Sequence, residues 1–167
     1  EEVAAIIERS QAEGVLQDEL GLLSGALEFS EKDASEVMVR DGDLITVDAG
    51  ASPADLEAAV ARTGFSRLPV RDSSGTVLGY LHVKDVLYAD ETSRTTPIPH
   101  WRVRALATVS TDTEIEEVLR AMQRSGTHLA GVVAATGDLV GVVFLEDILE
   151  ELVGEVSDSM QRHTVLP

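Results

Sequence analysis

Apolar and polar positions along this chain follow one pattern twice. Short apolar stretches alternate with segments in which apolar residues recur every three or four positions, which predicts strands interspersed with helices. The apolar stretch 44–47 returns at 106–109, and the residues that follow it recur at the same 62-residue separation without a gap. A fixed internal period indicates one structural unit used twice. The matched pairs are Gly64 and Gly126, Val70 and Val132, Gly75 and Gly137, Gly79 and Gly141, Asp85 and Asp147, and Leu87 and Leu149.

The first copy is predicted to fold as strand, helix, strand, turn, strand and helix. Ser52 followed by Pro53 is typical of a helix start, because the serine side chain caps free backbone N–H groups and proline suits the first helical position. Gly64 is expected to end this helix, where a left-handed backbone conformation favours glycine. The predicted elements are a strand at 44–47, the helix between Ser52 and Gly64, a strand at 68–70, a turn at 72–75, a strand at 77–83 and a closing helix that begins at Asp85.

The second copy follows the same plan. Thr113 and Glu116 have the spacing of a capping box at the start of a helix. The apolar residues Val118, Leu119 and Met122 give this helix one apolar face, and Gly126 is expected to end it. The remaining predicted elements are strands at 129–134 and 139–144, a turn at 136–138 between them, and a polar linker at 90–99 that joins the two copies.

An acidic segment with helical spacing precedes the two copies. It is interpreted as a solvated helix with one packed apolar face; a connecting helix from another domain, or a dimer contact, fits the same pattern. Because the chain begins at Glu1, we expect it to be a piece of a longer protein. The expected division is an acidic helical connector at 1–30, the first repeat at 31–95, the second repeat at 96–153 and a C-terminal exit segment at 154–167.

Charge and residue types argue against several classes of function. The formal net charge of −17 disfavours nucleic acid and anionic lipid surfaces as partners, since both carry negative charge. The chain has no cysteine, which excludes thiolate metal sites and a disulfide framework. The four histidines are scattered and the sequence holds no recognised catalytic motif, so we expect a protein that is not an enzyme.

Three blocks of sequence stand out: GFSRLPV at 64–70, GYLHVKDVL at 79–87 and LEDILEELVGE at 145–155. Together they resemble the CBS pair, or Bateman module, of the CorC/cyclin M (CNNM) hemolysin-like Mg²⁺ transport family. The resemblance implies an α+β fold, with two tandem β-α-β-β-α CBS repeats packed with pseudo-twofold symmetry and preceded by an N-terminal helical segment. Packing of the copies against each other also follows from their size, since one copy alone is too small to bury its sheet.

The same resemblance implies a function. It implies a regulatory module on the cytoplasmic face of the cell membrane that binds an adenine nucleotide, ATP or AMP, with Mg²⁺ accompanying ATP. Such a module controls an attached Mg²⁺ transporter. The expected partners are a second copy of the chain, bound through the CBS repeats, and the transmembrane and C-terminal domains of the parent protein; nucleic acid is not expected. The alternative is a nucleotide-free scaffold for dimerisation.

Side-chain chemistry is compatible with a nucleotide in one cleft between the copies. An ionised carboxylate such as Asp147 can accept hydrogen bonds from both ribose hydroxyls, although the same residue can also serve only to stabilise a helix N-terminus. Arg67 can bind two phosphate oxygens, while a surface charge with no ligand is the competing interpretation. By resemblance, Phe65 lies against adenine. The implied site comprises Val39, Phe65, Ser66, Arg67, Leu68, Pro69, Phe144 and Asp147, and a second nucleotide site is considered at Asp85 and Thr127.

Two residues depart from the family's pattern. Threonine commonly stands three residues before the ribose-binding aspartate, where this chain has Phe144, and threonine commonly follows Met38, where this chain has Val39. Each change removes a hydroxyl, and a lost hydrogen bond typically costs about 0.5–1.5 kcal/mol. Weak ATP binding, a preference for AMP and no binding at all are therefore three open alternatives. Mg²⁺ is expected to be held by the nucleotide phosphates, with no direct protein ligand.

Overall fold

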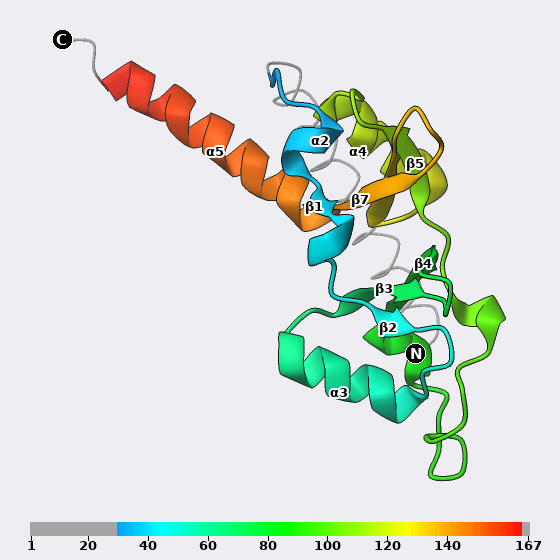
Figure 1. Ribbon diagram of the computed structural model, residues 1–167. Helices are drawn as coiled ribbons and strands as arrows, with labels where there is room; N and C mark the ends of the chain where they lie inside the picture. Colours follow the sequence, from blue (N-terminus) through cyan, green and yellow to red (C-terminus); the bar gives the residue numbers. More distant parts are fainter. Residues whose placement is uncertain (1–29, 165–167) are drawn as a thin grey trace.

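Residues 30–164 are described by the computed structural model, so the acidic segment predicted to be helical lies outside the described residues. The described chain forms two lobes, one above the other in Figure 1, and each lobe corresponds to one sequence repeat. The lower lobe contains β2 (Val47–Asp48), α3 (Pro53–Thr63), β3 (Arg67–Arg71), β4 (Val77–His82) and the 3₁₀ turn η2 (Val83–Val86). The upper lobe contains α2 (Ala34–Val37), β1 (Val39–Arg40), β5 (Ala107–Ser110), α4 (Ile115–Ser125), β6 (Leu129–Val133), β7 (Leu139–Phe144) and α5 (Leu145–Thr164).

Each lobe is built on one mixed sheet. In the lower sheet β2 runs parallel to β3, and β3 runs antiparallel to β4. The upper sheet has the order β1-β7-β6-β5, with β5 parallel to β6 and β6 antiparallel to β7. The crossover helices α3 and α4 bury apolar residues against their own sheets, and α5 adds Ile148 and Leu152 to the upper core. The predicted α+β fold of two repeats is therefore confirmed.

The predicted ends of α3 are confirmed at both termini. The hydroxyl of Ser52 accepts a hydrogen bond from the N–H of Asp55 at 3.2 Å, and the carboxylate of Asp55 accepts one from the N–H of Ser52 at 2.9 Å. This reciprocal pair is a capping box, and Pro53 occupies the first helical position. Gly64 ends α3 with φ of 78°, and Gly126 ends α4 with φ of 64°. Both glycines adopt the left-handed conformation that other residues avoid.

The segment that leads into each repeat packs in the lobe of the other repeat. The sequence did not predict this exchange. The strand β1 comes just before the first repeat, yet it pairs with β7 of the second, where Val39 lies opposite Val142. Ala34 of α2 is fully buried in the core of the upper lobe. In return, Arg104 comes just before the second repeat and forms an antiparallel bridge with Tyr80 of β4 in the lower lobe. Each lobe is therefore completed by the chain that enters the other.

This exchange explains one matched pair of glycines. A Cβ atom on Gly79 would collide with the carbonyl oxygen of Arg104, and a Cβ atom on Gly141 would lie 2.6 Å from the carbonyl oxygen of Val39. Both distances are shorter than real Cβ contacts. Glycine is required at both positions because the exchanged segment passes directly over the sheet.

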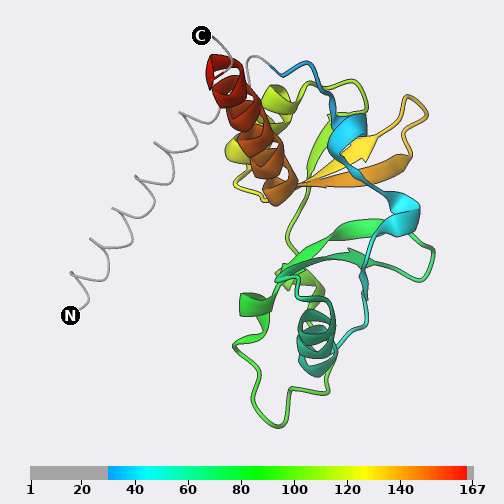
Figure 2. The ribbon, with the colours of Figure 1, turned by 90° about the vertical axis from the view of Figure 1, so that its left-hand side faces the viewer.

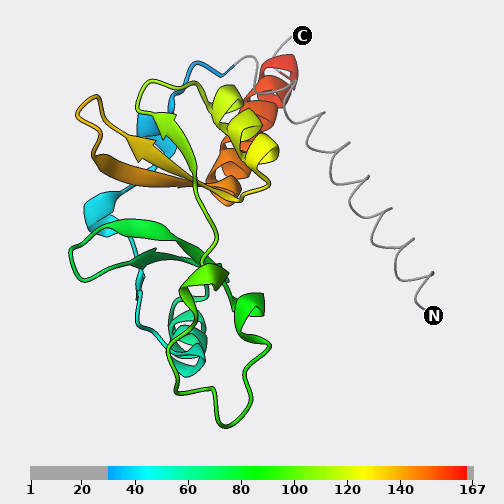
Figure 3. The same ribbon diagram turned by 90° about the vertical axis from the view of Figure 1, so that its right-hand side faces the viewer.

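The lobes contact each other through their sheets. Tyr80 of the lower lobe is 1% exposed and packs with Leu129 and Val142 of the upper lobe. Partly buried apolar residues surround these three: Leu44, Leu106, Leu139 and Phe144. Figures 2 and 3 show the two sheets facing each other across this contact, with α3 and α4 on the outer sides. The predicted packing of the two repeats as a pseudo-twofold pair is confirmed.

The predicted capping box at Thr113 and Glu116 is wrong. The helix α4 begins at Ile115, and the side chain of its N-cap residue, Glu114, makes no capping hydrogen bond. The hydroxyl of Thr113 accepts a hydrogen bond from the last backbone N–H of β5 instead. The N–H of Ile115 donates to the carbonyl oxygen of Lys32 at 3.2 Å, so the exchanged N-terminal segment supplies this cap. A local sequence window cannot reveal a partner so distant in the chain.

The two repeats end in different closing elements. The second ends in the 20-residue helix α5, whereas the closing helix predicted to begin at Asp85 is only the 3₁₀ turn η2, with Asp85 at its third residue. The first strand also begins later than predicted, at Val47 rather than residue 44. Leu44 is used in the contact between the lobes and does not join the sheet.

The segment between the repeats is anchored on the lower lobe. Ile98 is buried in the lower core, and its N–H donates to the carbonyl oxygen of Ala51 at 2.9 Å. Arg94 forms an ion pair with Glu57 of α3 at 2.7 Å. The segment 90–99, predicted to be a polar linker, is therefore packed against the lower lobe at two points. No helix among residues 30–164 is both long enough and apolar enough to cross a membrane.

Candidate functional site: a cleft between the two repeats

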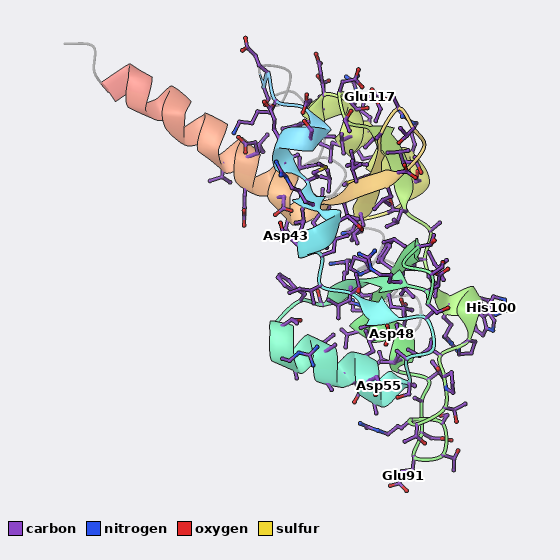
Figure 4. The ribbon with its side chains drawn as sticks, in the orientation of Figure 1. Asp43, Asp48, Asp55, Glu91, His100 and Glu117 are labelled. Atoms are coloured by element: carbon purple, nitrogen blue, oxygen red, sulfur yellow. The ribbon has the colours of Figure 1, made fainter. Side chains whose placement is uncertain are left out.

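A cleft of about 440 Å³ opens where the lobes meet. Three parts of the chain line it: the segment from β1 to the approach to β2, the loop from α3 to β3, and the junction of β7 with α5. Figure 4 shows Asp43, one of the lining residues, between the two lobes. The lining residues are Val39, Asp43, Leu44, Ile45, Gly64, Phe65, Ser66, Arg67, Leu68, Phe144, Glu146, Asp147 and Glu150.

The loop from α3 to β3 presents its side chains to the cleft because α3 ends abruptly. The left-handed Gly64 turns the chain out of the helix, which leaves Phe65 52% exposed. The carbonyl oxygen of Ser66 accepts a hydrogen bond from the N–H of Val83 at 2.9 Å, so the loop is fixed against the end of β4. Arg67 then begins β3, with its side chain 22% exposed.

One part of the cleft is apolar. Phe65 and Ile45 are both substantially exposed, at 52% and 44%, and both line the cleft. A large aromatic side chain at an open cleft offers a flat face on which a planar ring can stack. The other apolar lining residues are Val39, Leu44, Leu68 and Phe144. This part of the cleft is suited to a flat, largely apolar group such as a nucleobase.

Arg67 is the one basic residue among the described residues that line the cleft. Its guanidinium Nη1 lies 3.6 Å from the carboxylate of Glu146. Burial, together with the positive charge of Arg67, lowers the pKa of both His82 and His128. These two neighbours of Arg67 are therefore expected to be neutral near pH 7, which leaves Arg67 as the positive charge at this end of the cleft.

The part of the cleft formed by the start of α5 is acidic. Asp147 lies in the first turn of α5, and burial, followed by the charges of Glu150 and Glu146, raises the pKa of its carboxyl group. A hydrogen bond from the backbone of Phe144 acts in the other direction. With Asp43, four carboxylates line the cleft. Asp147 forms no ion pair with any described side chain, so acceptor sites beyond the one used by the backbone of Phe144 are available to a ligand.

Most of the residues implied by sequence resemblance come together in this cleft. Seven of the eight line it: Val39, Phe65, Ser66, Arg67, Leu68, Phe144 and Asp147. Pro69 does not line it, because it is buried within β3 opposite Tyr80. Arg67 is mostly buried at the cleft wall rather than on the open surface, and whether it meets a ligand stays a prediction.

Sequence reasoning missed several lining residues. Glu150 had a usable signal, since a position three residues after Asp147 on a helix lies near the same face, and Glu146 lies four residues before Glu150. Asp43, Leu44 and Ile45 had none, because their place depends on how the chain passes between the lobes.

The two residues considered for a second nucleotide site lie outside this cleft. Asp85 accepts hydrogen bonds from both ends of the Arg104 guanidinium, at 2.9 Å from Nε and 2.6 Å from Nη2. Thr127 directs its hydroxyl to the carbonyl oxygen of Leu129 at 3.2 Å. Among residues 30–164, no group of three or more histidine, cysteine, aspartate or glutamate side chains is arranged to hold a metal ion.

The geometry defines a tandem pair of CBS domains, and the sequence places the chain in a family. Residues 34–91 and 102–154 each match the CBS domain family, so the chain belongs to the CBS-domain proteins and contains two copies of the domain. Among solved structures, it is similar to the CBS domain of the bacterial CNNM/CorC family Mg²⁺ transporter in complex with ATP. That likeness has 26% sequence identity and a TM-score of 0.68, over 83% of this chain and 98% of the other. A hemolysin-like CBS protein of Oenococcus oeni PSU has 25% identity and a TM-score of 0.68, over 76% and 94% of the two chains.

Relatives in sequence are longer proteins. The chain is 36% identical to the uncharacterized protein Rv1841c of Mycobacterium tuberculosis over 167 residues, which is 96% of this chain and 48% of the relative. It is 27% identical to hemolysin C of Rickettsia prowazekii, over 84% of this chain and 47% of the relative. The chain thus spans about half the length of these relatives. The predicted likeness to the CBS pairs of CorC/CNNM and hemolysin-like proteins is confirmed.

Proposed function

We propose that this CBS pair is a regulatory, non-catalytic module that binds one adenine nucleotide in the cleft between its repeats. The observation that supports this most is the convergence of seven implied residues, from three separate parts of the chain, on one cleft of about 440 Å³. A similar CBS structure of a CNNM/CorC family transporter was solved with ATP. The cleft combines an apolar part, a guanidinium and a free carboxylate, which are the three kinds of group that a nucleotide needs.

In the proposed arrangement each part of the nucleotide meets a matching group. Phe65 and Ile45 contact the base, because both are exposed and apolar. Asp147 accepts hydrogen bonds from the two ribose hydroxyls, since a carboxylate is an acceptor and its own side chain has no charged partner among the described residues. Arg67 and the hydroxyl of Ser66 face the phosphates.

Because the cleft is acidic, its affinity for a nucleotide should depend on how many phosphates the nucleotide carries. Four carboxylates and one guanidinium line the cleft, so every added phosphate increases repulsion. Mg²⁺ bound to the phosphates of ATP offsets part of this charge, whereas AMP has less charge to offset. We therefore expect Mg²⁺ to matter for ATP and much less for AMP. The metal ion enters with the nucleotide phosphates in this proposal, and no protein side chain coordinates it.

The nucleotide signal is proposed to reach other parts of a longer protein. The cleft is lined by the first turn of α5, and this helix continues to Thr164, away from both lobes (Figure 1). A nucleotide that contacts Asp147 can therefore bias the position of α5. In the proposed setting the module lies on the cytoplasmic face of the membrane, pairs with a second copy through its CBS repeats, and controls an attached Mg²⁺ transporter.

A nucleotide-free scaffold for dimerisation is the second candidate function. The observation that favours it is that Phe144 and Val39 line the cleft with apolar groups. At these two positions the chain offers a ligand no hydroxyl, so the lost hydrogen bonds weaken nucleotide binding.

Calorimetric titration separates the two functions. The chain is titrated with ATP, ADP and AMP, each with and without Mg²⁺, and the same series is repeated with Asp147→Ala and with the control Glu91→Ala. Glu91 is an exposed carboxylate at the far end of the lower lobe in Figure 4. Asp147→Ala removes two charge-assisted hydrogen bonds of about 1.5–3 kcal/mol each, so we expect at least a tenfold loss of affinity.

The control variant Glu91→Ala should bind each nucleotide as tightly as the parent does. If the parent binds no nucleotide at millimolar concentration, the scaffold function replaces the regulatory one. If Asp147→Ala binds as tightly as the parent, the nucleotide does not use this cleft.

A further inference from the structure

The exchanged segments place Arg104 and Val39 at equivalent positions in the two halves. Tyr80 and Val142 are separated by the 62-residue repeat, so they occupy matching places in β4 and β7. Arg104 bridges Tyr80, with its N–H and its carbonyl oxygen each bonded to the backbone of Tyr80 at 2.9 Å. Val39 lies opposite Val142 in the same antiparallel manner. By sheet register, Arg104 and Val39 therefore occupy equivalent positions in the two halves.

The glycines support the same equivalence independently. The nearest atom to a Cβ placed on Gly79 is the carbonyl oxygen of Arg104, and the carbonyl oxygen of Val39 is among the nearest to a Cβ placed on Gly141. The two glycines are also matched by the sequence repeat. The side chains of Arg104 and Val39 thus start from matching backbone points beside matching aspartates, Asp85 and Asp147.

At Asp85 this position is occupied by a cation. The Nε of Arg104 lies 2.9 Å from Oδ2 and 3.2 Å from Oδ1 of Asp85, and Nη2 lies 2.6 Å from Oδ1. The backbone N–H of His82 donates a fourth hydrogen bond to Oδ2 at 2.9 Å. A carboxylate has about four acceptor sites, so these bonds leave none for another donor. The side chain of Asp85 is 12% exposed.

At Asp147 the same position carries an apolar side chain. Val39 lines the cleft and has no group that can donate a hydrogen bond to the carboxylate. Asp147 keeps the equivalent backbone hydrogen bond, from Phe144, but forms no ion pair with any described side chain. The two aspartates therefore differ in the side chain that stands at the exchanged position.

We propose that the residue at this exchanged position decides which half of the pair takes a ribose: Arg104 closes the half around Asp85, and Val39 leaves the half around Asp147 open. This inference rests on the proposed nucleotide function. A ribose offers two neutral O–H donors, and these cannot replace the bidentate bonds of a charged guanidinium on equal terms. The chain consequently binds one nucleotide, although its repeats provide two aspartates.

The experiment exchanges the two side chains and counts binding sites. The parent, Arg104→Val, Val39→Arg and the control Arg94→Val are titrated calorimetrically with AMP. Arg94 is paired with Glu57 on the outer side of the lower lobe, so its replacement removes the same charge far from both aspartates. We expect one site in the parent and in the control, two sites in Arg104→Val, and at least a tenfold loss of affinity in Val39→Arg.

A double variant locates the added site. Asp85→Ala combined with Arg104→Val should return the stoichiometry to one. If Arg104→Val does not fold, Arg104→Gln replaces it, because glutamine keeps the length of the stem but cannot form the bidentate ion pair. Retained binding at the first site reports that the Arg104 variants and the double variant are folded, and thermal unfolding reports the same for Val39→Arg.

The outcomes separate this inference from the proposed function. Two sites in the parent, or one site in both the parent and Arg104→Val, overturn the inference and leave the proposed function standing. No site in the parent but one in Arg104→Val overturns the proposed function and the open half of the inference, and supports only the closing role of Arg104. No binding in either protein overturns both.

Discussion

The two CBS repeats share their chain path but differ in charge beside the cleft. Where the second repeat has Glu146, Asp147 and Glu150 at the start of α5, the first repeat has Lys84, Asp85 and Tyr88 at the matching positions. The second closes with a 20-residue helix, and the first closes with a four-residue 3₁₀ turn. One half of the pair is therefore acidic and open at its aspartate, and the other half is closed by an internal ion pair.

The comparison distinguishes residues that both repeats need for packing from residues that determine what each aspartate can bind. The matched glycines, the glycine ends of the crossover helices and the contact between the sheets are shared by both halves because both must pack the same elements. The residues around the two aspartates are free to differ, since they face the spaces that the packing leaves. A repeated fold can in this way retain one ligand site and turn the other into structure.

The largest expected effect concerns the shared framework. Gly79→Ala and Gly141→Ala each place a Cβ against the backbone of an exchanged segment, so we expect each to destabilise the protein by about 1–3 kcal/mol or more. Gly79→Ala should cost more, because its closest contact is a backbone carbonyl, whereas a flexible Met38 side chain shares the contact at Gly141. Urea-induced unfolding measures both.

Gly50→Ala is the matched control for these variants. Nothing lies within 4 Å of a Cβ at Gly50, so the change in its free energy of unfolding should stay within about 0.5 kcal/mol. If Gly79→Ala is as stable as Gly50→Ala, the exchanged segment does not pass over the sheet as described.

Sequence reasoning reached the fold because its signals are local or repeated. The helix start at Ser52, the helix ends at Gly64 and Gly126, and the 62-residue period each follow from neighbouring residues or from the chain compared with itself. The exchange of the entry segments was not predictable, because β1 pairs with a strand about 100 residues further along the chain. The cap of α4 was mispredicted for the same reason.

The candidate site was predictable in part. The family resemblance supplied the loop at 65–68 and Asp147, and the structure brings them together. It placed Asp147 in the main site and Asp85 only in a possible second site, but it could not show which neighbours each carboxylate has. The ion pair of Asp85 depends on the tertiary position of Arg104, and that position is set by the bridge to Tyr80.

A second prediction uses the opposite pKa shifts of the two aspartates. Burial raises the pKa of Asp85, but the hydrogen bonds from Arg104 and His82 outweigh it, so the pKa is lowered. Burial and the neighbouring glutamates raise the pKa of Asp147. At pH 7 we therefore expect Asp85→Asn to be less stable than the parent by about 1 kcal/mol and Asp147→Asn to be equally or more stable.

The pH dependence of the free energy of unfolding tests the directions of these two pKa shifts. Stability from Asp85 is present above the unfolded pKa of about 3.9 and is lost as the pH falls through the lower folded value. Stability from Asp147 is present below about 3.9 and is lost as the pH rises through its higher folded value. Both variants should therefore approach the parent in stability once the pH falls below the lowered folded pKa of Asp85. An Asp147→Asn variant that is clearly less stable than the parent at pH 7 would contradict the free carboxylate described here.

The smallest expected effect concerns the charge of the open cleft. Glu150→Gln removes one of four carboxylates and keeps the side-chain volume. A unit charge about 8 Å away contributes roughly 0.5 kcal/mol even in a water-like dielectric, so ATP in Mg²⁺-free buffer should bind about two- to fivefold more tightly to the variant. AMP should change less because it carries fewer charges, and Mg²⁺ should reduce the gain for ATP. Glu91→Gln, remote from the cleft in Figure 4, removes the same charge and should change neither affinity. An equal gain for AMP and ATP would mean that Glu150 acts on the shape of the cleft and not on its charge.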